Sequence, residues 1–87
     1  MAQLLCDFTV VRVSASPPIV WITDDDNPCR RSITNDAETV CQILQRAYPG
    51  HRIIYRDTMG SWDELAHDRG CFLGFRPARD LAIEVPA

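Results

Sequence analysis

The sequence predicts a single small α+β domain over residues 1–87, with a mostly antiparallel sheet of four to six strands and one helix packed across one face. Three observations support this prediction. Short runs rich in β-branched and aromatic residues recur along the chain, one segment has helical spacing of its apolar residues, and clusters of Pro, Gly, Asp and Asn separate these segments. The segments follow one another in the order β-β-α-β-β-β, which is typical of a helix lying on an antiparallel sheet.

The composition is that of a globular protein without an excess of positive charge. The 87 residues are 46% hydrophobic and 24% charged, with a formal net charge of −3. General binding to nucleic acids or to anionic membranes needs a positive field, so we expect neither kind of partner. All nine basic residues are arginine. Biased codon usage explains this better than a special need for bidentate anion recognition.

The sequence also predicts a cytoplasmic location. No apolar run approaches the roughly 18 residues of a membrane span, and the N-terminus lacks the basic region of a signal peptide. The cysteines form no C-x-x-C pair, and free thiols are the rule in a reducing compartment. If the protein were secreted, three disulfide pairings would be open to them. The four are Cys6, Cys29, Cys41 and Cys71.

Two strands are expected before the helix. Residues 4–13 alternate, and residues 19–23 are a continuous apolar run typical of a strand covered on both faces. Residues 14–18 contain two prolines and form a short connection, which favours antiparallel pairing. Residues 24–28 are rich in Asp and end the second strand. The core-facing side chains of the first strand are expected to be Leu4, Cys6, Phe8 and Val10.

Residues 35–48 are predicted to form the helix. Asn35 suits the N-cap, and Glu38 completes a capping-box-like pair with it. Pro49 and Gly50 end the helix. Apolar residues three and four apart form one stripe that should face the sheet. These residues are Ala37, Val40, Cys41, Leu44, Ala47 and Tyr48.

The segment after the helix allows two interpretations. Residues 52–57 should form a strand, and residues 57–60 suit a type I turn leading into a second strand at 61–67. Ser61 and Glu64 also fit a capping box that would open a short helix over the same residues. We favour the hairpin, because a helix of about seven residues is marginal by itself.

The hairpin has consequences for the rest of the sheet. It places Trp62 beside Tyr55, and residues 71–75 continue the meander after a second tight turn at 68–70. The alternating tail at 81–85 either adds an edge strand or frays.

The meander also provides the candidate binding residues. It holds more large aromatic groups than one short helix can cover, so an aromatic patch rimmed by arginine should stay exposed. The arginines of the first strand can pair with Asp63 or Glu64 on the next strand. Alternatively, they form a strip with Arg76 and Arg79 that binds an anion or a partner. The candidates are Trp62, Tyr55, Arg52 and Arg56.

Signals for metal binding are incomplete. Asp24 and Asp26 follow a strand and offer carboxylates to a hard cation. The calcium-loop pattern nevertheless fails, because Cys29 and Asn35 occupy its glycine and glutamate positions. No Cys or His residues form the close pairs typical of zinc sites. We therefore predict no metal site and no cofactor.

Signals for catalysis are equally incomplete. His67 lies near carboxylates in the sequence and could act as a general base. Ser61 or Cys71 could then serve as nucleophile. The neighbouring carboxylates are Asp63, Glu64 and Asp68.

Together these observations favour a non-enzymatic binding or interaction module that recognises a protein partner or a second copy of itself in a homodimer. The alternative is a small hydrolytic or metal-dependent enzyme using Asp24, Asp26, Asp57 or His67. Nucleic-acid binding through Arg30, Arg31, Arg52 and Arg56 conflicts with the net charge. An acidic domain with arginine as its only cation resembles compact bacterial or phage accessory proteins.

Overall fold

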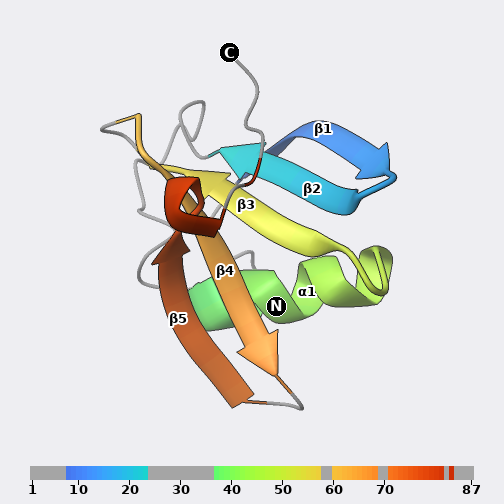
Figure 1. Ribbon diagram of the computed structural model, residues 1–87. Coiled ribbons are helices and arrows are strands. Elements are labelled where there is room, and N and C mark those ends of the chain that lie inside the picture. Colours follow the sequence, from blue (N-terminus) through green and yellow to red (C-terminus); the bar gives the residue numbers. More distant parts are fainter. Residues whose placement is uncertain (1–7, 24–36, 58–59, 69–70, 82, 84–87) are drawn as a thin grey trace.

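The fold is α+β, as predicted. A computed structural model describes residues 8–23, 37–57, 60–68, 71–81 and 83 (Figure 1). The described helices are α1 (Ala37–Ala47) and the short 3-10 helix η2 (Arg79–Leu81). The strands are β1 (Thr9–Ala15), β2 (Pro18–Thr23), β3 (Arg52–Arg56), β4 (Trp62–Asp68) and β5 (Cys71–Pro77), with α1 between β2 and β3 along the sequence. In these ranges, neither helix is long and apolar enough to cross a bilayer.

Several predictions fall outside the described residues. They concern the start of the first strand, the Asn35 cap, and most of the tail after residue 81. The other predicted residues in this position are Cys6, Asp24, Asp26, Cys29, Arg30 and Arg31.

The five strands form one sheet in the order β1-β2-β3-β4-β5. Three neighbouring pairs are antiparallel, whereas β2 and β3 run parallel. The parallel pair arises because the connection containing α1 returns the polypeptide to the end of the sheet at which β2 began. The sequence predicts a mostly antiparallel sheet but does not identify this pair.

Residues 61–67 are strand and not helix, so the hairpin interpretation is confirmed. The Asp57 amide donates to the Ser61 carbonyl at 2.9 Å, and the Gly60 amide donates to the Asp57 carbonyl at 3.0 Å. Gly60 has φ +87°, the left-handed conformation that closes a three-residue hairpin loop. The turn is therefore one residue longer than a two-residue hairpin.

This loop length changes which residues meet across the hairpin. Trp62 lies opposite Arg56, and Tyr55 lies opposite Asp63. Because successive side chains on a strand point to opposite faces, Trp62 and Tyr55 are on different sides of the sheet. The prediction that Trp62 lies beside Tyr55 was wrong.

Replacing Gly60 by alanine should destabilise the hairpin. A Cβ at Gly60 would meet no atom within 4 Å, so the penalty comes from the backbone conformation alone. We expect Gly60→Ala to lower the free energy of unfolding by about 1–2 kcal/mol, measured by urea denaturation. A change below about 0.3 kcal/mol would show that the turn tolerates another conformation.

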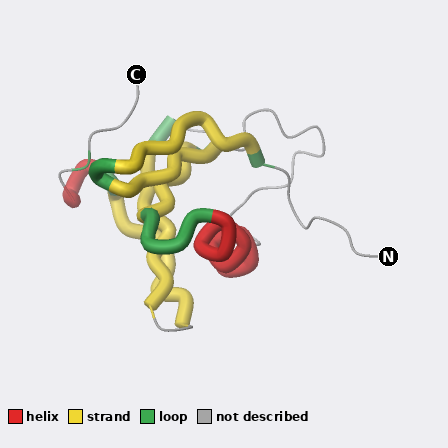
Figure 2. Tube along the Cα trace, turned by 90° about the vertical axis from the view of Figure 1, so that its right-hand side faces the viewer, coloured by secondary structure: helices red, strands yellow, loops and turns green. Residues whose placement is uncertain are grey.

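The two faces of the sheet are covered differently. α1 lies on one side and η2 on the other (Figure 2). The predicted helix stripe is buried from residue 37 to residue 44, but Ala47 is exposed. It packs against a core of sheet residues on the α1 side: Val20, Ile22, Ile53, Tyr55 and Leu65.

The first strand departs most from its predicted exposure. Phe8 packs against the α1-side core, as expected, but Val10 is 37% exposed. β1 forms an edge of the sheet, whereas α1 packs over β3, β4 and β5. Toward the other terminus, Leu81 lies in η2 and not in a strand, and Ile83 packs against the second core, opposite α1.

Candidate functional site

A row of side chains crosses the sheet on the face opposite α1, here called the open face. Cross-strand pairs link it in sequence: Arg12 to Trp21, Trp21 to Ile54, Ile54 to Glu64, and Glu64 to Arg76. Directly opposed residues project from the same face. Trp21 and Ile54 are buried in the middle of the row. The open face therefore has an apolar centre with an arginine at either end.

Glu64 organises the charges on one side of this row. Its Oε2 accepts a hydrogen bond from Arg52 Nε at 2.7 Å, and its Oε1 accepts from Arg52 Nη2 at 2.9 Å and from Arg76 Nη2 at 3.0 Å. The predicted pairing of Arg52 with Glu64 is thus confirmed. Hydrogen bonding to Glu64 raises the pKa of Arg52. One carboxylate neutralises only one of the two arginines, so the cluster keeps a positive charge.

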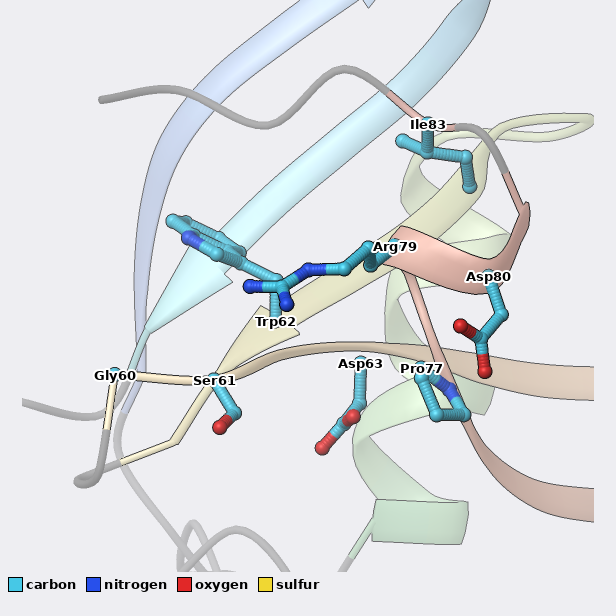
Figure 3. Close-up of a pocket in the computed structure, with 8 residues that line it drawn as sticks. All are labelled: Gly60, Ser61, Trp62, Asp63, Pro77, Arg79, Asp80 and Ile83. Atoms are coloured by element: carbon cyan, nitrogen blue, oxygen red, sulfur yellow. The ribbon is translucent and has the colours of Figure 1, made fainter.

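Trp62 and Arg79 border a hollow of about 540 Å³ at the η2 end of the open face (Figure 3). The Arg79 side chain extends toward Trp62, while Asp63 points away from it. The Arg56 guanidinium carbon lies 5.5 Å from the centroid of a Trp62 ring, within cation–π range. The hollow can therefore hold a group that has both an apolar part and a negative charge.

Asp63 at the rim of this hollow is held in an environment unfavourable to its charge. Burial, and secondly the charge of Asp57, raise the pKa of Asp63. A raised carboxyl pKa means that folding disfavours the ionised form, so stability falls as the pH rises through the range in which Asp63 ionises. A cation bound near Asp63 would relieve this effect, and an anion would increase it.

The arginines are concentrated on this side of the molecule. Six arginines lie in the described ranges, and only Arg46 is on α1. The other five line the open face or its hollows: Arg12, Arg52, Arg56, Arg76 and Arg79. Sequence alone places Arg52 and Arg56 on one face, but the rest gather only through the strand register.

The predicted binding residues are divided between the two faces. Trp62, Arg52 and Arg56 lie on the open face, whereas Tyr55 is only 1% exposed in the α1-side core. The Tyr55 ring is 6.3 Å from that of Phe75, centroid to centroid. Tyr55 therefore contributes to the core and not to the surface patch that was expected.

The residues of the enzymatic alternative do not form one site where the structure describes them. The carboxylate of Asp57 accepts a hydrogen bond from the Ser61 amide at 2.9 Å, at the start of β4. His67 lies near the other end of that strand, about 20 Å away at roughly 3.3 Å per residue. Among the described residues, no group of three or more His, Cys, Asp or Glu is arranged to hold a metal ion.

The two described cysteines should differ strongly in reactivity. Burial, and secondly the charge of Glu64, raise the pKa of Cys41 to about 11, whereas Cys71 is exposed. Because the thiolate is the nucleophile, iodoacetamide at pH 8 should alkylate Cys71 at least about 100-fold faster than Cys41. Mass-spectrometric mapping of the labelled peptides measures this ratio. Equal rates would show that α1 detaches from the sheet on the timescale of the reaction.

Comparison of the sequence and fold with protein-family models, with curated proteins and with solved structures finds no match. The function must therefore be inferred from the charge and shape of the open face.

Proposed function

We propose that the protein is a non-enzymatic binding module whose open face recognises an acidic segment of a protein partner. The observation that carries the proposal is the gathering of five of the six described arginines around Trp62 and Trp21, in a protein with a net charge of −3. Arginine beside an aromatic ring is well suited to bind carboxylates, because its guanidinium can donate two parallel hydrogen bonds. Both residue types are also enriched at protein interfaces.

The shape of the open face favours a protein over a nucleic acid. Proteins that bind single strands stack bases on exposed aromatic rings, but Trp21 is only 2% exposed and Trp62 is half-buried. Glu64, Asp63 and Asp80 also lie among the arginines and would repel a phosphate backbone. A partner with spaced carboxylates can avoid them.

The same charges disfavour a homodimer in which two open faces meet. Such an isologous interface would bring like-charged arginines together. A separate partner with negative charge meets no such repulsion.

An octaglutamate peptide, acetylated at its N-terminus and amidated at its C-terminus, provides a direct probe. Fluorescence anisotropy of the labelled peptide should report saturable binding to the protein at low salt. Arg79→Glu should weaken binding about fivefold, because a reversed surface charge changes the free energy by roughly 1 kcal/mol.

Arg46→Glu is the matched control, since it makes the same charge change on α1. It should leave the affinity within about twofold of the wild type. Equal weakening by both substitutions would show that the peptide responds only to net charge, and absence of binding at low salt would also contradict the proposal.

A further inference from the structure

A second hollow on the open face has features of a ligand site. It encloses about 360 Å³ beside the β1–β2 turn, and Ile83 lines both this hollow and the one at Trp62. Arg12, Arg52, Ser14 and Ser16 line its polar side, and Ile19 and Trp21 line its apolar side. This volume is at the lower end of the range for ligand pockets, enough for one apolar group with a charged group attached.

Arg12 is held in a position to bind an anion. Its guanidinium carbon lies 4.7 Å from the centroid of a Trp21 ring, and that ring is buried and fixed by the sheet. In the described ranges, no carboxylate forms an ion pair with Arg12. The cation–π contact orients the guanidinium but leaves its hydrogen-bond donors available.

Arg52 and the two serines add donors to the same hollow. Arg52 contacts Glu64 through Nε and Nη2, and its Nη1 group takes no part in these hydrogen bonds. The hydroxyl groups of Ser14 and Ser16 can each donate one hydrogen bond. An anion here would meet two guanidinium groups and two hydroxyl groups, opposite an apolar wall.

We propose that this hollow binds a carboxylate joined to an apolar body, the chemistry presented by the free C-terminus of a polypeptide that ends in an apolar residue. The proposal rests on the proposed function in one respect, namely that the partner is a protein. A free organic acid with an apolar side group presents the same chemistry. The apolar wall distinguishes this ligand class from inorganic phosphate and from a bare acidic side group.

Titration of the full-length protein with N-acetylleucine, followed by amide NMR shifts, tests the proposal. We expect a dissociation constant on the order of 1 mM, reasonable for so small a ligand. N-acetylleucinamide lacks the charge and should bind at least about tenfold more weakly. Inorganic phosphate lacks the apolar body and should also bind at least about tenfold more weakly.

Variants place the ligand in this hollow and not elsewhere. Arg12→Gln should weaken N-acetylleucine binding about tenfold or more, whereas Arg79→Gln, at the other hollow, should leave it within about twofold. Ser14→Ala, which should weaken binding about threefold, provides a second variant should Arg12→Gln fail to fold. A free tripeptide, Gly-Gly-Leu, and its amide then identify the source. Binding of the free tripeptide supports a polypeptide C-terminus, and binding of N-acetylleucine alone supports a small organic acid.

Equal binding of the acid and its amide would overturn the carboxylate assignment, and equal binding of phosphate would overturn the apolar part. If N-acetylleucine does not bind at all, the inference fails, while the octaglutamate result with Arg79→Glu still judges the proposed function separately.

Discussion

Tyr55→Ala should leave the protein largely unfolded. Tyr55 is 1% exposed and fills the core between β3 and α1, where it contacts the ring of Phe75. Removing a buried aromatic ring from a close-packed core costs about 3–5 kcal/mol. A domain of 87 residues has a total stability of only about 4–13 kcal/mol. Urea denaturation followed by circular dichroism measures the loss.

Tyr55→Phe is the matched control, because it keeps the ring and removes only the hydroxyl group. It should cost no more than about 1.5 kcal/mol. A Tyr55→Ala protein that stays folded with nearly normal stability, and loses only peptide binding, would restore Tyr55 to the binding surface.

Glu64→Gln should be the most damaging single change on the open face. The Glu64 side chain is 6% exposed and accepts from both Arg52 and Arg76, whose side chains are 43% and 54% exposed. Removing the charge leaves two guanidinium groups facing a neutral amide. Loss of one partner from a buried ion pair costs about 3–5 kcal/mol, and solvent around the arginines reduces this to about 2 kcal/mol.

Two controls separate this electrostatic effect from a change of shape. Arg76→Gln removes a single contact and leaves the bidentate Arg52–Glu64 pair intact, so it should cost less than half as much. Added salt screens repulsion between arginines, so the deficit of Glu64→Gln should shrink between 0.05 and 1 M NaCl, at roughly 14 and 3 Å Debye length. A deficit independent of salt would mean that packing, and not charge, is responsible.

Local sequence signals predicted the elements of the fold more successfully than their mutual placement. The helix stripe ending at Leu44 and the hairpin at Gly60 follow from periodicity and turn chemistry, which act over a few residues. The faces of Tyr55 and Trp62 depended on whether the loop has an odd or even number of residues. One residue in the loop moved Trp62 to the opposite side of the sheet from Tyr55.

The candidate site was only partly accessible from sequence for the same reason. Arg52 pairs with Glu64 as expected, because both belong to one hairpin. Arg12 joins the open face through the parallel pairing of β2 with β3, a contact between segments separated by α1. No local pattern specifies that register. Arg79 comes into place through η2, where the alternating tail had indicated a strand.

The most direct test of the open face as the binding surface is an NMR titration with the amidated octaglutamate peptide. We predict that the largest shifts occur at the indole N–H of Trp62 and at the side-chain Nε–H groups of Arg56 and Arg79, with little change along α1. Shifts centred on α1 residues such as Gln42 and Arg46, with the Trp62 indole unaffected, would contradict the proposal.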